Sequence, residues 1–456
     1  MFFCDDDEKK ERSRTGMRFC HPDEVSGISR RQMLKHGISL AGFMTAGQFM
    51  GVPAALSQTT SVQRRLVWIM MGGGWDILET VDPRPASTSG IEIMYQWNLA
   101  NQIAGAADDL KVGRWMPNLA ALGADMVVVR GLSMGTNSHT AGQVYMDTGV
   151  LSNSGNVNAA SIPAIIASQS AATIPVIQLA GGMDVQTDRA TNNVSVVRAQ
   201  NLELYRSMYP ENSAQLEQKL RIMNHLQASV ARVQEATGTN DRLTAISTAQ
   251  SKIRTQFESD VRSQLAVDAA DLAPFTTGAP NSVNNNNANA FAMTAKLLKN
   301  NLVSAINLGI GGFDTHSNQQ QRMQPIVESF DFLLSTLVNE LRTAGALDNT
   351  LIVVVSDFGR TPIVNNSNGR DHWATGGAML LGGGIEGSRV VGAADDNLRA
   401  IPVNTTTGQA DASGEQLSAK HLGGSVVDLC LGNTFFSEKR SGYLYSIPAL
   451  TQLKSS

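Results

Sequence analysis

The chain has few cysteines, little net charge and no long apolar run, and each shortage excludes a class of protein. Three of its 456 residues are cysteines. The formal charge of -4 gives no sign of the basic surface that nucleic-acid binding favours, so no nucleic-acid partner is expected. No wholly apolar run reaches the roughly 18 residues of a membrane helix, so no stable span is expected. With 42% hydrophobic and 17% charged residues, the composition is that of a globular protein.

The N-terminal segment, residues 1–57, has the order of a twin-arginine export signal. Arg30 and Arg31 precede a weakly apolar stretch rich in glycine and alanine, which ends in small residues near Ser57. We therefore expect export by the twin-arginine translocase, cleavage near Ser57, and a periplasmic or secreted protein. The alternative is a chance pair of arginines before a buried helix.

The cysteines agree with this division of the chain. Cys4 and Cys20 lie in the signal region, which leaves Cys430 alone in the mature protein. No intramolecular disulfide is therefore expected after export, although the destination is oxidising. Residues 58–456 are expected to form an α/β domain.

Six apolar runs bounded by glycine or polar residues predict buried strands. Long helical patterns separate several of them, and one such helix is predicted within residues 324–345. Continuous apolar runs alternating with helices predict a doubly wound, mainly parallel sheet covered on both faces. The six runs are residues 66–71, 124–132, 174–182, 302–310, 350–360 and 376–384.

A helical insertion is predicted at about residues 202–275. Apolar residues recur at helical spacing from Leu216 to Val233 and again from Leu243 to Val261, with Gly238 between the two patterns. This predicts a helical hairpin that either covers the sheet as a lid or braces it. The asparagine-rich residues 278–290 have low complexity and are predicted to form a loop.

Acidic and histidine side chains follow the predicted strands. Because the carboxyl ends of strands in an open α/β sheet meet in one crevice, these side chains are expected to converge there. Aspartate and histidine together suit zinc first, then manganese or iron, and calcium less well. The alternative for each acid alone is a helix cap, and for the last histidine a packed, hydrogen-bonded ring. The predicted ligands of one or two divalent ions are Asp76, Asp314, His316, Asp357 and His372.

Two arginines bracket the last of these loops. Arg360 and Arg370 carry planar forks of donors that match the oxygens of phosphate or sulfate, so both are predicted to bind a substrate anion. The alternative is a pair of surface ion pairs.

Four motifs, taken in order behind the leader, resemble a known family. They are "GGGWD", "GGFDTHSNQ", "SDFGRTP" and "GRDHW". In this order they resemble the family labelled domain of unknown function 1501, which belongs to the alkaline phosphatase and sulfatase superfamily. The resemblance covers nearly all of the mature chain. It implies a doubly wound sheet, one or two divalent metals, and a nucleophile at a helix start that attacks phosphorus or sulfur. It also implies that the five predicted ligands match the superfamily's metal-binding acids and histidines.

The chain departs from the superfamily pattern at two places. Phe358 stands where relatives often have a ligating histidine. Relatives place the nucleophile about nine residues before a Thr-Gly pair, and this spacing reaches His139, between Ser138 and Thr140. Thr140 or Ser138 is therefore a candidate hydroxyl nucleophile, and His139 either attacks phosphorus itself or is a further ligand. A simple helix start, capped by Asn137 or Ser138, is the alternative.

These patterns lead to two hypotheses about function. The first is an exported metal-dependent hydrolase of a phosphate or sulfate ester, in a small molecule or a polymer. The metal and an arginine would hold the anion, and a hydroxyl or a metal-bound water would attack it. The second is a non-catalytic secreted or envelope protein that keeps the superfamily fold.

Overall fold

The computed structural model describes residues 64–85, 99–107, 110–153, 157–170, 172–189, 191, 194–239, 241–432 and 444–453. The predicted export signal, with Arg30, Arg31 and both of its cysteines, lies outside these residues. The chain divides into two compact units: a smaller one that includes Leu202–Ser263, and a larger one of Gln58–Asn201 and Gln264–Ser456. Within the described ranges, none of the helices has both the length and the apolar character that a membrane crossing needs.

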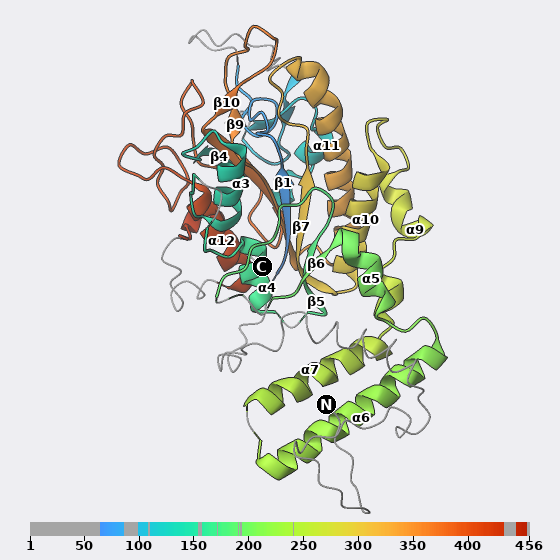
Figure 1. Ribbon diagram of the computed structural model, residues 1–456. Helices are drawn as coiled ribbons and strands as arrows, with labels where there is room; N and C mark the ends of the chain where they lie inside the picture. Colours follow the sequence, from blue (N-terminus) through green and yellow to red (C-terminus); the bar gives the residue numbers. More distant parts are fainter. Residues whose placement is uncertain are drawn as a thin grey trace, which may run out of the picture. The chain divides into compact units, whose positions relative to one another are not determined.

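An eight-stranded sheet forms the centre of the larger unit, in the order β12-β4-β11-β8-β1-β7-β5-β6 (Figure 1). Neighbouring strands from β8 to β6 pair in parallel, and β12 is parallel to β4. Strand β11 alone runs antiparallel to both of its neighbours. The prediction of a mainly parallel sheet is confirmed. The strands are β1 (Arg65–Met71), β4 (Met126–Ser133), β5 (Ile174–Gln178), β6 (Val196–Arg198), β7 (Val303–Ile310), β8 (Thr350–Ser356), β11 (Thr375–Gly382) and β12 (Arg389–Val391).

Two smaller ladders and a set of helices surround this sheet. The ladders pair β2 (Asn101–Gln102) with β3 (Lys111–Val112), and β9 (Gly359–Arg360) with β10 (His372–Trp373). The helices and short 3-10 turns outside the smaller unit are α2 (Pro117–Ala120), η4 (Gly123–Asp125), α3 (His139–Thr148), α4 (Ile162–Ser168), η5 (Ala199–Asn201), α9 (Ala269–Leu272), η6 (Ala273–Phe275), α10 (Asn285–Lys299), α11 (Gln319–Thr343), α12 (Ala419–Leu431) and α14 (Pro448–Thr451).

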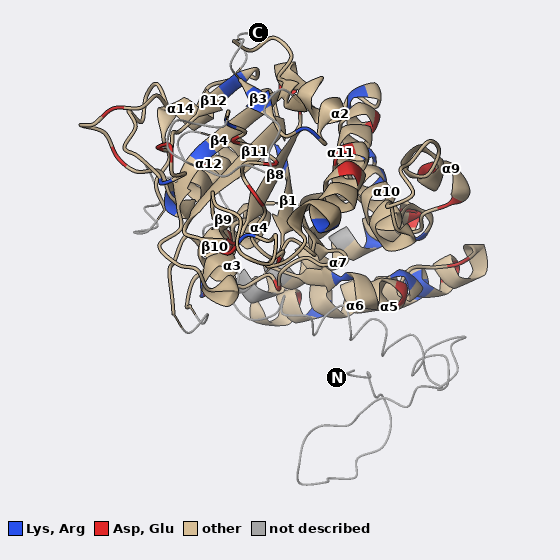
Figure 2. Ribbon diagram, turned by 90° about the horizontal axis from the view of Figure 1, so that it is seen from above, with Lys and Arg blue, Asp and Glu red and all other residues tan. Residues whose placement is uncertain are grey.

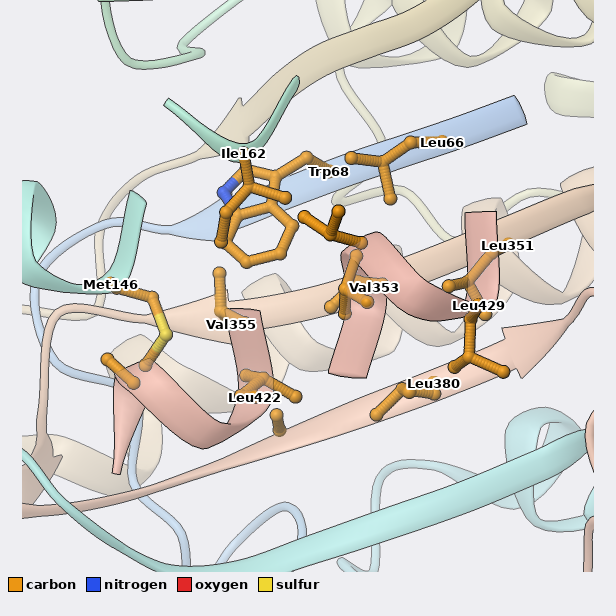
Figure 3. Close-up of a cluster of buried hydrophobic side chains, with 14 of the residues drawn as sticks. Leu66, Trp68, Met146, Ile162, Leu351, Val353, Val355, Leu380, Leu422 and Leu429 are labelled. Carbon is orange, nitrogen blue, oxygen red and sulfur yellow. The ribbon is translucent and has the colours of Figure 1, made fainter. Parts of the chain in front are cut away.

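Helices cover both faces of the sheet, as the doubly wound prediction requires. Helices α10 and α11 lie on one face, and α3, α4 and α12 lie on the other (Figure 1). One buried cluster joins the sheet to the second group of helices (Figure 3). It includes Trp68 of β1, Val353 of β8, Met146 of α3 and Ile162 of α4. Full burial of one such side chain contributes about 1.5–3 kcal/mol to folding. Because helices cover both faces of the sheet, residues on both sides of each strand are buried, and the strands are continuous apolar runs in the sequence.

The asparagine-rich segment is helical, which corrects the prediction of a loop through residue 290. Helix α10 begins at Asn285, and the side chain of Asn284 accepts a hydrogen bond of 2.8 Å from the Asn287 amide. Ala288 and Phe291 follow at helical spacing and are buried. The capping bond from Asn284 and the buried apolar face therefore outweigh the poor helix propensity of the repeated asparagines.

The smaller unit is a helical hairpin, as predicted. Its helices include α5 (Leu202–Ser207), α6 (Ser213–Thr237) and α7 (Asp241–Glu258), and α8 (Val261–Gln264) follows at its boundary. Gly238 ends α6 with a φ of 78°, which favours glycine. Met223 and Phe257 are buried in the hairpin. Its role as a lid or a brace stays a prediction.

One buried acid in the larger unit should make stability depend on pH. Asp147 of α3 is 1% exposed, and within the described chain neither of its carboxylate oxygens has a hydrogen-bond partner. Burial raises its pKa to about 7, although the neighbouring Ser161 hydroxyl offsets part of the shift. The folded state therefore keeps this proton up to about pH 7, whereas the unfolded chain releases it near pH 4.

Stability from this group should be lost as pH rises from about 4 to 7. We expect the free energy of unfolding to fall by up to about 4 kcal/mol more in the wild type than in Asp147→Asn across this window. Urea unfolding at pH 4 and pH 8, which bracket this window, measures the difference. Asp184→Asn, at an exposed acid, is the control and should follow the wild type. Parallel pH profiles for Asp147→Asn and the wild type would contradict the expectation.

Candidate metal centre

Four side chains from distant parts of the chain converge beyond the carboxyl ends of the parallel strands. Asp314 and His316 lie in the loop after β7, His139 begins α3, and His372 lies in β10. The pairing of β10 with β9, directly after β8, brings His372 back to this edge, and both views show β9 and β10 beside α3 (Figures 1 and 2). The open sheet thus places the four side chains together, as the sequence predicts for three of them.

The four side chains meet around one carboxylate oxygen. Asp314 Oδ1 lies 3.0 Å from His316 Nε2, 3.3 Å from His372 Nε2 and 3.5 Å from His139 Nε2. The Nε2 atoms of His316 and His372 are 3.0 Å apart. Three imidazoles therefore point the same ring nitrogen at a shared space.

Hydrogen bonds fix the tautomer of two of these rings. His372 Nδ1 lies 2.8 Å from the Asn137 carbonyl oxygen, which can only accept, so Nδ1 carries the proton. His316 Nδ1 lies 2.8 Å from Asp371 Oδ1, and a carboxylate likewise accepts. In each neutral ring, Nε2 is therefore the atom with the free lone pair. Acceptors behind ligating histidines commonly orient them in this way.

The third ring, His139, is held by a buried carboxylate. Its Nδ1 lies 2.5 Å from Asp357 Oδ2, and this hydrogen bond is the main cause that raises the pKa of His139. The other Asp357 oxygen accepts from the Gly74 amide at 2.5 Å. Gly74 has a φ of 72°, and a Cβ there would lie 2.7 Å from the Phe358 ring. Gly74, the last of the three glycines, is thus explained by backbone that must pass close to Phe358.

The donors fit a bound divalent cation. Ligand atoms about 2.0–2.2 Å from a tetrahedral zinc lie roughly 3.3–3.6 Å from one another. The distances from Asp314 Oδ1 to the three Nε2 atoms, and between the Nε2 atoms of His316 and His372, are close to this at 3.0–3.5 Å. His139 Nε2 is buried and has no hydrogen-bond partner among the described residues, as a vacant ligand atom would. His139, Asp314 and His372 form a group that could hold a metal ion.

The side of this group formed by Asp314 and His316 is open to solvent. Their side chains are 50% and 47% exposed, respectively. Phe358 closes another side, with its ring centroid 4.7 Å from that of His139 and 4.6 Å from that of His372. Three ligands with an open position are typical of a catalytic rather than a structural zinc site.

Asp314 is kept ionised by its neighbours. Partial burial alone would raise its pKa, but the hydrogen bond from Arg360, the adjacent His372 ring and the charges of Arg360 and His139 lower the pKa to about 2. Arg360 Nη2 lies 2.5 Å from Asp314 Oδ1. The carboxylate is therefore available as an anionic ligand throughout the working range of pH.

Both predicted anion-binding arginines are committed to protein groups. Arg360 is fully buried and donates to the carbonyl oxygens of Gly73, Gly74 (2.9 Å) and Arg370 (3.0 Å), besides Asp314. Arg370 is 1% exposed. Its Nη1 donates to the carbonyl oxygens of Thr361 (2.8 Å) and Pro362 (2.5 Å). These guanidinium groups hold the loops of the site, and their contact with a substrate anion stays a prediction.

Asp76 and Asp357, both predicted to ligate the metal, make contacts within the protein, and their role as ligands stays a prediction. Asp76 is fully buried. Its Oδ2 lies 3.1 Å from Arg370 Nε and also contacts Gln319 Nε2, while Oδ1 accepts from the Leu78 amide at 2.9 Å. Asp357 lies behind His139, as described above. Of the five predicted ligands, the structure brings Asp314, His316 and His372 together and gives the two buried acids supporting contacts.

The predicted nucleophiles lie at the start of α3. Ser138 is the N-cap residue of this helix, without a side-chain cap hydrogen bond, and both Ser138 and Thr140 are exposed. Within the described ranges, neither hydroxyl hydrogen-bonds to Asp314, His316 or His372. His139, the third candidate, lies among the metal-binding donors.

Sequence reasoning missed Asp371 and the Asn137 carbonyl. Asp371 precedes His372 in "GRDHW", and an acid beside a candidate ligand is a signal that could have suggested an orienting group. The hydrogen bond with His316 is the main cause that lowers the pKa of Asp371. No side-chain pattern can reveal a backbone acceptor such as that of Asn137.

Comparisons with known proteins give one family and several distant structures. The family model described as "Protein of unknown function (DUF1501)" matches residues 63–407. No curated protein matches the chain.

The similar solved structures include three bacterial proteins. One is the PsFucS1 sulfatase from Pseudoalteromonas sp. (12% identity, 94% of this chain and 77% of that one, TM-score 0.37). Another is the lipoteichoic acid synthase LtaP from Listeria monocytogenes (10%, 90% and 81%, TM-score 0.37). A third is a protein in the alkaline phosphatase superfamily from Vibrio parahaemolyticus (10%, 81% and 73%, TM-score 0.32).

Proposed function

The chain belongs to the family of proteins of unknown function DUF1501, and from that premise we propose that it is an exported, metal-dependent hydrolase of phosphate or sulfate esters. The observation that supports the proposal is the convergence of three imidazole Nε2 atoms on the Asp314 carboxylate, with one side open to solvent. Such a donor set binds a divalent ion while leaving room for a substrate oxygen. The substrate is an ester in a small molecule or a polymer.

The proposed cofactor is a single divalent ion, with zinc as the first choice. Imidazole nitrogens and one carboxylate suit zinc, and manganese or iron follow. Calcium prefers a cage of oxygen donors, which this group does not supply. One ion rather than two is favoured because the Asp76 carboxylate already faces Arg370. When bound, the ion would act as a Lewis acid and lower the pKa of a coordinated water.

His316 is proposed to move the proton. Its Nε2 faces the open side of the group, and its Nδ1 proton is held by Asp371 at 2.8 Å. In this arrangement Nε2 accepts a proton from the attacking water, and the Asp371 carboxylate stabilises the resulting imidazolium. Asp314, His139 and His372 bind the ion.

The attacking group and the site of action stay predictions. The hydroxyl of Thr140 or Ser138 is the alternative to water as the nucleophile. Export by the twin-arginine translocase to the periplasm or the exterior depends on residues 1–57.

Metal removal tests the proposal. Protein recovered after export should contain about one divalent ion per chain, measured by plasma mass spectrometry. It should hydrolyse at least one of an aryl phosphate, an aryl phosphodiester and an aryl sulfate. Treatment with a chelator should lower this rate by at least about a hundredfold, and zinc should restore it.

Two results would count against the hydrolase. One is less than one tightly bound ion per chain. The other is a metal-loaded protein that is inert toward all three substrates, which would favour the non-catalytic envelope protein. Two observations support this second function. Phe358 packs against His139 and His372, and within the described ranges the hydroxyls of Ser138 and Thr140 do not hydrogen-bond to Asp314, His316 or His372.

A further inference from the structure

The two most exposed side chains of the metal centre lie on either side of a buried one. Thr315 is fully buried, whereas the side chains of Asp314 and His316 are half exposed. The loop after β7 therefore turns Thr315 inward and its two neighbours outward. Any contact that holds Thr315 also fixes the backbone from which Asp314 and His316 project.

A buried ring of hydrogen bonds holds Thr315. Its hydroxyl donates to Gln319 Oε1 at 2.5 Å, and Gln319 Nε2 donates to Asp76 Oδ2. The same Asp76 oxygen lies 3.1 Å from Arg370 Nε. The Arg370 amide donates to the Thr315 carbonyl oxygen at 3.1 Å, which closes the ring. Each of the four residues is at most 1% exposed, so the ring is sealed from water.

Gln319 is the member of the ring that matches both of its neighbours. Its amide oxygen faces the Thr315 hydroxyl, which donates, and its NH₂ group faces the Asp76 carboxylate, which only accepts. The Phe313 carbonyl oxygen, the other acceptor near this hydroxyl, is farther away at 3.3 Å. A carboxylic acid in place of the amide would set two acids against each other. An apolar side chain would leave a buried hydroxyl and a buried carboxylate with one partner fewer.

The loop between β9 and β10 holds the same backbone from another side. A Cβ on Gly369 would lie 2.0 Å from the His316 carbonyl carbon, so this approach requires glycine. Asn365 Nδ2 donates to the His316 carbonyl oxygen at 3.1 Å. The Gln319 amide donates to the Asn368 carbonyl oxygen at 2.8 Å. Gln319 thus joins the two loops through its backbone as well as through its side chain.

We propose that Gln319 is a positioning residue of the metal centre. Through the Thr315 hydroxyl it fixes the relative position of Asp314, which binds the ion, and His316, which moves the proton. This inference rests on the proposed metal-dependent function, and it gives a role to a buried residue that touches neither the ion nor the substrate. Outer contacts that orient the ligands of a metal typically change its affinity by about 10–100-fold.

Metal binding by two variants of similar shape tests this role. Gln319→Met keeps the length of the side chain without the amide, and Thr315→Val keeps its branching without the hydroxyl. Each should weaken cobalt binding by about 10–100-fold in competition with a chelator, and should change the visible absorption of the bound cobalt. Because both variants break one hydrogen bond, the double variant should lose less than the product of the two single effects. Gln320→Met, at the exposed next position, should bind cobalt as the wild type does.

A second control separates positioning from loss of stability. Asp331 is another buried side chain of α11, and it accepts hydrogen bonds from the Asn118 and Leu119 amides. Asp331→Asn should lower the free energy of unfolding and leave cobalt binding unchanged. If it weakens cobalt binding as much as Gln319→Met does, general loosening explains the effect and the proposal is overturned.

Nitrogen NMR of the metal-free protein separates this inference from the proposed function. In the wild type His316 should carry its proton on Nδ1, toward Asp371, and Gln319→Met should mix the two tautomers. A wild type that binds no divalent ion would refute the proposed function, while the tautomer still tests the positioning. Unchanged cobalt affinity and an unchanged tautomer in Gln319→Met would overturn the positioning alone. Should that variant fail to fold, the same two results in Thr315→Val would overturn it.

Discussion

Replacing Asp314 by asparagine is expected to remove the bound metal and to lower ester hydrolysis by at least about a thousandfold. Asp314 Oδ1 lies within 3.5 Å of the Nε2 atoms of His139, His316 and His372, so it is the anion around which the group is built. Its pKa of about 2 means that the negative charge is present at any working pH. The amide keeps the size of the side chain and removes that charge. Metal content and kcat/KM measure the two effects.

Asp371→Asn provides the graded comparison for Asp314→Asn. It keeps every ligand and removes only the carboxylate that orients His316. His316 is proposed to move the proton and not to bind the ion, so this variant should keep its metal affinity while kcat/KM falls by about a hundredfold or more. Competition with a fluorescent chelator gives both affinities. Full metal content in Asp314→Asn would contradict the site as described.

The Arg360→Met variant is expected to lose about 3–5 kcal/mol of unfolding free energy. The guanidinium is fully buried, and it joins the carbonyl oxygens of Gly73, Gly74 and Arg370 to the Asp314 carboxylate. Methionine fills part of the volume but leaves these acceptors without donors. The loops after β1, β7 and β8 should therefore loosen together. Urea unfolding of the metal-free protein measures this loss without the contribution of the ion.

Two further arginine variants serve as comparisons for the stability of Arg360→Met. Arg360→Lys keeps the charge but cannot match the planar fork, so its stability should lie between Arg360→Met and the wild type. Arg342→Met removes an arginine that is 43% exposed and paired with Asp125, and it should change stability by less than about 1 kcal/mol. A loss at Arg360→Met no larger than that at Arg342→Met would show that the buried network is not needed.

The fold could be predicted because strands that are buried on both faces appear in the sequence as continuous apolar runs. Leu66–Met71 and Leu351–Val355 are continuous apolar runs, since every residue of such a strand meets a covering helix. The direction of a strand, in contrast, cannot be deduced from its apolar run. The run at Thr375–Gly382 looks like the others, yet it forms the one reversed strand, β11.

The site could be predicted only in part, for a related reason. Asp314, His316 and His372 follow strands and face the open end, as the spacing indicates. Asp76 also follows a strand, but its ion-pair partner Arg370 lies near the other end of the domain's sequence. The partner that a buried acid meets is decided by tertiary structure, so spacing alone cannot separate a ligand from a supporting carboxylate.

The position of β1 has a consequence for how the protein is made. This strand is the first of those described, yet it lies between β7 and β8, which begin at Val303 and Thr350. During synthesis on the ribosome, β1 therefore cannot pair with either neighbouring strand until β7 and β8 have been made. Such long-range pairing folds slowly and exposes an unpaired, aggregation-prone edge meanwhile. A chaperone that shields Leu66–Met71 during synthesis would protect the segment on which the centre of the sheet is later assembled.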